Sequence, residues 1–178
     1  RVKQIDYKNK DFYKSYFLNK KKHLPLIDAK IAISKDFFTN NKQLKWITNS
    51  KSRQVAHLLR SNYDCIISTS RSINKDNSLL NCRIDGLNIY KPDLIIIDRN
   101  LKIKKKLKFY NLSKKRKTYL FTTNNNKKKI SFLKRKKIKV ILLNKLENKN
   151  DFTYMFNKLF KIGNGRILIE TGLTFLNK

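Results

Sequence analysis

Basic side chains and hydroxyls gather between residues 45 and 83 of this sequence, in a spacing that could serve chemistry. Arg53, His57 and Arg60 recur at offsets of four and seven, which brings them to one side of a helix. A short apolar run at 65–67 then leads into the three hydroxyls of residues 68–70. A helix that only packs needs no such alignment beside a hydroxyl-rich loop. A solvated basic face would give the same pattern in so basic a chain, and these residues alone leave both explanations open.

The elements that must position these groups are predicted from the same stretch and its surroundings. Asn49 is a suitable N-cap for the helix, and Val55, Leu58 and Leu59 form its apolar side. The run at 65–67 is long enough only for a buried strand. Further strands are predicted at 26–34, 93–98, 118–123, 138–143 and 166–170, and further helices at 1–22, 127–134 and 151–160. Strands that alternate with helices indicate one α/β domain with parallel strand pairs.

Polar residues stand where the predicted strands end: Trp46-Ile47-Thr48, residues 68–70, Asp98, Thr122 and Glu170. In open α/β sheets, ligands bind outside the carboxyl ends of the strands, so this edge is the predicted binding site. Asp98 is the exception, because we expect its carboxylate to close a turn. The chain has four glycines and contains neither G-x-G-x-x-G nor GxxxxGK(S/T), so neither a Rossmann fingerprint nor a P-loop is predicted.

The net charge of +31 is the unusual property of the composition. It suits a nucleic-acid-binding module, in which lysine and arginine neutralise phosphates, or a background bias toward lysine, asparagine and isoleucine in every segment. Because no aromatic residues stand within a basic stripe, bias is favoured and nucleic acid is not the expected partner. Cys65 and Cys82 lack CxxC spacing, so no disulfide framework is predicted. With no apolar run of membrane length and no signal peptide, the expected location is the cytoplasm.

The pattern WIT-x3-SR-x3-H-x-LR-x3-D-x-I at residues 46–66 resembles the reductase domain of the bifunctional riboflavin biosynthesis deaminase/reductase. The family's spacing continues through Asp76-Asn77, Leu80 and Arg83 to Glu170, Gly172 and Thr174. The resemblance implies a dihydrofolate-reductase-like α/β fold, with a mixed, mostly parallel sheet flanked by helices. It also implies that residues 1–24 are a connector helix from a missing N-terminal deaminase domain, and that residues 25–178 are the reductase domain without its C-terminal elements. A homo-oligomer is the expected assembly.

The reaction implied by the resemblance is the NADPH-dependent reduction of 5-amino-6-(5-phospho-D-ribosylamino)uracil, with hydride going to C1′ of the opened ribose imine. NADPH contacts would come from Ala32, Trp46, Thr48, Ser72, Asp76, Gly172 and Thr174. Substrate contacts would come from Arg60, Leu80, Arg83 and Glu170. Lys30 and Glu170 would be the catalytic residues, with the lysine polarising the imine or protonating its nitrogen. For Lys30 an edge-strand position, for Glu170 a helix cap and for Trp46 a core position are the competing explanations, and His57 is expected to be structural.

Five residues depart from the family's pattern: Phe37, Leu44, Arg71, Arg99 and Thr171. Phe37 replaces a glycine suited to positive φ, and Thr171 stiffens a loop that would wrap the cofactor pyrophosphate. Arg71 would either reach the NADPH 2′-phosphate or block the cleft. Two other functions therefore remain open, namely a basic nucleic-acid-binding module and a nucleotide-binding relative without turnover.

Overall fold

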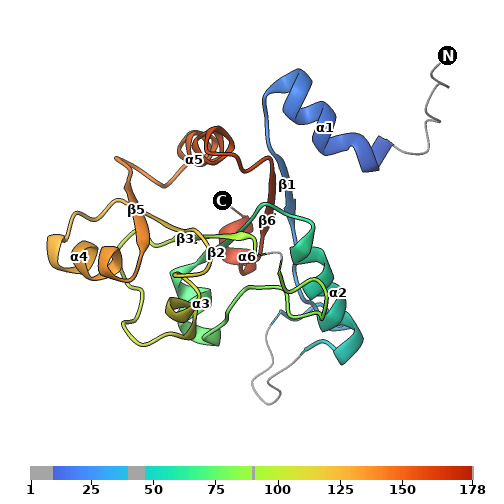
Figure 1. Ribbon diagram of the computed structural model, residues 1–178, viewed down its shortest axis with the longest axis horizontal. Helices are drawn as coiled ribbons and strands as arrows, with labels where there is room; N and C mark the ends of the chain where they lie inside the picture. The colour runs from blue at the N-terminus through green and yellow to red at the C-terminus, as the bar shows by residue number, and fades with distance from the viewer. Residues whose placement is uncertain (1–9, 40–46, 90, 178) are drawn as a thin grey trace.

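The computed structural model of this chain describes residues 10–39, 47–89 and 91–177. Six strands form a single sheet in the order β1-β6-β2-β3-β4-β5, and every pairing in these ranges is parallel (Figure 1). The strands are β1 (Leu26–Ala29), β2 (Cys65–Thr69), β3 (Asp93–Ile97), β4 (Thr118–Thr122), β5 (Ile138–Leu142) and β6 (Arg166–Ile169). Because the strands are parallel, all their carboxyl ends lie at one edge of the sheet. This is the edge at which the sequence predicts the binding site.

Helices alternate with the strands along the chain. They are α1 (Lys10–Lys22), α2 (Ser50–Ser61), α3 (Ser70–Asp76), a 3₁₀ turn η2 (Lys108–Asn111), α4 (Lys127–Arg135), α5 (Lys149–Lys161) and the short α6 (Leu173–Leu176). α1 lies beside β1 at one end of the sheet and α4 beside β5 at the other (Figure 1). No helix in the described ranges is long and apolar enough to cross a membrane.

The core consists of two apolar clusters, one on each face of the sheet. Successive residues of β3 alternate between them: Ile95 packs with Met155 and Leu159 of α5, while Leu94 and Ile96 pack on the other face. That second face is covered by α3, α4 and η2, through residues that include Ile73, Leu133 and Phe109. Strands covered on both faces read as continuous apolar runs, which is why residues 93–97 could be predicted as a buried strand.

Three predicted elements differ in extent from the structure. β1 ends at Ala29, whereas a strand over 26–34 was predicted, and β2 runs on to Thr69. Ile47 and Thr48 form a bend and no strand, and Trp46 lies outside the described residues. The described part of the predicted helix at 1–22 begins at Lys10, and its Tyr16 and Phe17 are exposed.

α1 is held to the sheet by a polar contact. Asn19 Nδ2 donates to the carbonyls of Leu24 and Gly165, at 2.9 and 3.2 Å. A Cβ on residue 165 would come within 2.3 Å of Asn19 Oδ1, so the close approach of the helix depends on glycine there.

Candidate active site

Three charged side chains meet at the carboxyl ends of β1 and β6. Glu170 follows β6, and its carboxylate receives Arg60 in a bidentate pair, Nε to Oε1 at 2.6 Å and Nη2 to Oε2 at 2.9 Å. Lys30 follows β1, and its Nζ lies 3.7 Å from Glu170 Oε2. The Glu170 side chain is 8% exposed and that of Lys30 31%, so the carboxylate is buried while the lysine side chain is partly exposed. The predicted catalytic pair and one predicted substrate-binding arginine thus form one cluster, here called the Glu170 cluster.

The cluster lies just past the ends of β1 and β6, where backbone hydrogen bonds continue the parallel pairing by one residue. Lys30 N donates to Ile169 O at 3.0 Å and Glu170 N to Ile67 O at 2.9 Å, so the two residues leave adjacent strands in register. Ser68 Oγ, from the third neighbouring strand, donates to the Glu170 carbonyl at 2.8 Å. Arg60 reaches the cluster from the last turn of α2, whose first turn is capped by Asn49 through Ser52 N at 2.8 Å. The predicted cap is confirmed, and Glu170 pairs with arginine where a helix cap had been the alternative.

His57 connects two arginines on the rim of the Glu170 cluster. Its Nδ1 lies 2.9 Å from Asn81 O, and its Nε2 lies 3.0 Å from Arg83 Nη2. The neutral ring with hydrogen on Nδ1 satisfies both contacts, because Nδ1–H donates to the carbonyl and Nε2 accepts from the guanidinium. Arg60 Nη1 donates to the same Asn81 carbonyl at 3.1 Å. Burial, and next the charge of Arg60, lower the pKa of His57 below its usual 6.5, which favours this neutral form.

A buried arginine, Arg116, holds the loop that carries Asn81 and Arg83. Arg116 Nη1 donates to Leu80 O at 2.7 Å, and its Nη2 donates to Leu79 O. Burial lowers the pKa of Arg116 to about 10, and Asp93 counters part of that effect. Leu80 has a φ of 49° and a side chain buried in the core, so its predicted substrate contact would have to use its backbone.

Asp98 has the turn-closing role that the sequence predicted. Its Oδ1 accepts from Ser70 Oγ and Lys102 N, and its Oδ2 from Ile103 N, each at 2.8 Å. The residue is 2% exposed, so its carboxylate fixes the loop after β3 to the start of α3. Asp98 therefore stabilises the loop at the strand ends, and its buried carboxylate is not available to a ligand.

The residues predicted to bind NADPH lie around the carboxyl ends of β1, β6 and β2. Ser72 is half-buried in α3, where its Oγ lies 3.0 Å from Thr69 Oγ1, and Asp76 is exposed at the end of the same helix. Gly172 and Thr174 are exposed after β6, while Ala32 and Thr48 are half-buried in the loops after β1 and before α2. Within the described ranges no hydrogen bond or ion pair joins these six to the Glu170 cluster, and Trp46 lies outside those ranges.

The departures from the family's pattern take distinct positions. Phe37 has a φ of 63° and is 80% exposed, so the chain keeps the left-handed turn without its glycine. Arg71 is exposed in the first turn of α3, and Thr171 is buried. Arg99 pairs with Glu147 at 3.1 Å on the surface, away from any predicted contact. Leu44 lies outside the described residues.

Comparison with known proteins decides the family. The model of the RibD C-terminal domain matches residues 25–178, which is most of the chain. The chain belongs to this family. Among curated proteins no sequence matches it.

Solved structures of the family share the fold. The Thermotoga maritima deaminase/5-amino-6-(5-phosphoribosylamino)uracil reductase has a TM-score of 0.71 at 19% identity, covering 92% of this chain and 43% of that one. Acinetobacter baumannii RibD gives 0.74 at 19% identity, covering 93% and 45%, and the Saccharomyces riboflavin biosynthesis reductase Rib7 gives 0.68 at 19%, covering 94% and 74%. The dihydrofolate-reductase-like α/β fold is therefore confirmed, and this RibD C-terminal domain spans less than half the length of the two bacterial proteins.

Two contacts of the site were not predicted from the sequence. His57 was expected to be structural, but its position between Arg60 and Arg83 was not predicted, because it follows from the loop at 81–83 folding back over α2. Asn81 gave no signal in the sequence, although its carbonyl accepts from both His57 and Arg60 and its Oδ1 is buried without a partner. The spacing of Arg53, His57 and Arg60 was the only pattern that could have found the first of them.

Proposed function

We propose that this chain is the NADPH-dependent reductase domain that converts 5-amino-6-(5-phospho-D-ribosylamino)uracil into its ribitylamino product in riboflavin biosynthesis. The observation that carries the proposal is the Glu170 cluster, in which a partly exposed lysine is held by a buried carboxylate at the strand carboxyl ends of a RibD C-terminal domain. Cytoplasmic location, a homo-oligomeric assembly and linkage to a deaminase domain in a longer protein belong to the same proposal.

The residues around the strand ends fit a dinucleotide in their chemistry. No atom lies within 4 Å of a Cβ built on Gly172, so the backbone there is open to the close approach of a pyrophosphate. Ser72 and Thr174 offer hydroxyls, Asp76 a carboxylate suited to ribose hydroxyls, and exposed Arg71 a cation suited to a 2′-phosphate. When bound, NADPH supplies the hydride that reduces C1′ of the opened ribose imine.

The chain's own residues would bind and orient the substrate and protonate its imine nitrogen. Lys30 is the proton donor in this proposal: as the imine carbon gains hydride, the imine nitrogen gains a proton from Nζ, and the C=N bond becomes a C–N bond. Glu170 holds that ammonium in place, because its Oε2 lies 3.7 Å from Lys30 Nζ. Arg60 holds the carboxylate in turn, through two hydrogen bonds that fix its orientation.

Arg83 is the best-placed cation for the substrate phosphate. It is exposed, and one of its Nη atoms contacts His57, so most of its donors face outward. Arg60 has already committed its fork to Glu170 and is the secondary contact. The phosphate would then lie on the α2 side of the Glu170 cluster, with C1′ toward Lys30.

The test is oxidation of NADPH by the purified chain in the presence of the phosphoribosylaminopyrimidine, followed by absorbance of the reduced nicotinamide. Lys30→Met, which keeps the stem and removes the ammonium, should lower kcat by a factor of about 100 to 1,000 while NADPH still binds. NADPH binding is measured separately by fluorescence of the nicotinamide, with Asp76→Ala expected to weaken it. Saturable binding without substrate-dependent oxidation would identify a nucleotide-binding relative and overturn the reductase assignment.

A further inference from the structure

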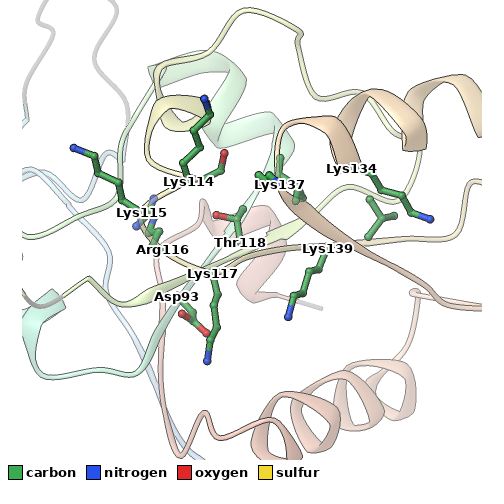
Figure 2. A pocket seen from close by; sticks show the side chains of 12 residues that line it. Asp93, Lys114, Lys115, Arg116, Lys117, Thr118, Lys134, Lys137 and Lys139 are labelled. Atoms are coloured by element: carbon green, nitrogen blue, oxygen red, sulfur yellow. The ribbon is translucent and has the colours of Figure 1, made fainter.

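A second polar site lies at the edge of the sheet opposite the Glu170 cluster. Asp93, Thr118 and Ile138 are the first residues of β3, β4 and β5, and all three line a hollow of about 820 Å³ (Figure 2). Its other lining residues are Ser113, Lys114, Lys115, Arg116, Lys117, Lys134, Lys137, Lys139 and Val140. We call it the lysine hollow. It shares no residue with the Glu170 cluster.

The concentration of charge in the lysine hollow exceeds the background of this chain. Seven of its twelve lining residues are lysine or arginine, against 43 of 178 in the whole sequence. Asp93 is the only carboxylate among the twelve. All six lysines are exposed, and in the described part of the chain none has a carboxylate within ion-pairing distance. Their charges are therefore available to an anion from solution.

The lysines spread over an extended area. Figure 2 shows Lys115 and Lys134 at opposite ends, and Lys117 and Lys139 projecting away from Lys114. A compact anion would engage one or two of these flexible point charges, whereas a row of phosphates would engage them all. No aromatic residue lines the hollow, so it offers no surface on which bases could stack.

Two buried donors point independently to an oxyanion at this place. Arg116 is 7% exposed and Thr118 is 1% exposed, and both line the hollow. Arg116 Nε and Thr118 Oγ1 have no hydrogen-bond partner among the described residues. Buried donors without acceptors are rare in folded proteins. Because both atoms are closed off from solvent, the missing acceptor would be a water that bridges them to a phosphate bound at the lysines.

We propose that the lysine hollow binds the phosphate backbone of duplex nucleic acid. Dispersed lysines contact phosphates without reading sequence, and the absence of lining aromatics favours a duplex over a single strand. From the sequence, nucleic acid was only the less favoured alternative, because the hollow is assembled from separate segments at 113–118 and 134–140 that each look like background charge. The inference is independent of the proposed reductase function.

The experiment measures fluorescence anisotropy of a short labelled DNA duplex at several salt concentrations, with the whole chain. The test variant is Lys114→Gln/Lys115→Gln/Lys137→Gln, and the matched control is Lys104→Gln/Lys105→Gln/Lys106→Gln, three exposed loop lysines with the same loss of charge. Each phosphate contact contributes about 0.9 to the slope of log affinity against log salt, so the test variant should flatten that slope by about 2 to 3. Its affinity at about 0.1 M salt should fall at least about tenfold, and that of the control less than about threefold.

A single isosteric change tests the buried donors. Thr118→Val should weaken duplex binding about threefold without lowering the melting temperature, because the hydroxyl it removes has no partner in the folded chain. Equal losses in the two triple variants, or an unchanged affinity in Thr118→Val, would overturn the proposal. So would displacement of the duplex by inorganic pyrophosphate at equal phosphate concentration, which would indicate a small phosphorylated ligand. Equally tight binding of a single strand would also overturn it.

Discussion

His57 should control how this RibD C-terminal domain holds Arg83, the arginine proposed to bind the substrate phosphate. The side chain donates through Nδ1 to Asn81 O and accepts from Arg83 through Nε2, at 2.9 and 3.0 Å. The amide nitrogen of asparagine lies near the position of Nδ1, and the amide oxygen of glutamine near that of Nε2. His57→Asn therefore keeps the contact with Asn81 and loses Arg83, whereas His57→Gln keeps an acceptor for Arg83.

The expected effect of His57→Asn on KM follows from the loss of one charge-assisted hydrogen bond at a partly exposed position. Its loss should cost about 1 to 1.4 kcal/mol of substrate binding, a five- to tenfold increase in KM for His57→Asn. His57→Gln should stay within about threefold, and kcat should change little in both, because Lys30 and Glu170 are untouched. The two variants should therefore differ in KM, with a higher KM for His57→Asn than for His57→Gln.

Titration of the His57 ring should make both stability and KM depend on pH. Burial and Arg60 lower the folded-state pKa of His57 below 6.5, with Arg83 acting in the same direction, while the Asn81 carbonyl and Glu170 oppose them. The unfolded chain therefore binds the proton more readily, so the stability contributed by the neutral ring is complete above pH 6.5 and is lost as pH falls through the folded-state pKa. Protonation also removes the acceptor for Arg83, so KM should rise on the same acid side.

The assay measures KM and kcat for the phosphoribosylaminopyrimidine from about pH 5.5 to 8. The substrate phosphate itself gains a proton at about pH 6, so the KM of both proteins should change, and the wild-type KM should rise more steeply toward low pH than that of His57→Gln. His23→Asn, at the exposed second histidine, is the control and should match the wild type. Equal KM values for His57→Asn and His57→Gln, or a wild-type KM that rises no more steeply below pH 6.5 than that of His57→Gln, would refute the link between His57 and Arg83.

Three further changes test the supports of the site. Glu170→Gln should abolish most activity and lower the free energy of unfolding by about 3 kcal/mol, because it leaves the Arg60 charge poorly paired; denaturant titration and the reductase assay measure both. Asp98→Asn should cost about 1 to 3 kcal/mol in the same titration, since an amide nitrogen would face a backbone N–H, with unchanged NADPH binding if the loop survives. Phe37→Gly should raise stability by about 0.5 to 1 kcal/mol, because glycine adopts a φ of 63° without strain; a lower melting temperature would contradict this.

The sheet could be predicted from the sequence because burial on both faces leaves a direct signal. Residues 94–97 form one apolar run between Asp93 and Asp98, and all neighbours of β3 in the sheet had been expected as strands. The predicted strand over 26–34 was too long, because its apolar run continues past Ala29 into a segment whose last described backbone hydrogen bond to β6 is Lys30 N to Ile169 O. Ile31 and Ile33, in the segment that follows the edge strand β1, are exposed. Periodicity alone does not report where pairing stops.

The site was predicted only as a set of residues. Resemblance to the family gave Lys30, Arg60 and Glu170, and strand ends gave the edge where they meet, yet neither shows which side chain is paired with which. The Asn81 contribution comes from its backbone carbonyl, a group that every residue has, so no side-chain pattern could predict it. Trp46 and the contacts expected from it stay a prediction.

Arg60 and Arg83 show why residue type does not settle role. Both were predicted as substrate contacts, and the guanidinium of each offers the same bidentate fork to a phosphate. In the structure the fork of Arg60 is filled by Glu170, so at most two of its five N–H donors remain for a ligand. Arg83 is exposed and tied by one contact to a neutral histidine, which adds no charge to neutralise. A phosphate would therefore gain more from Arg83, whereas Arg60 orients the Glu170 carboxylate that lies beside Lys30.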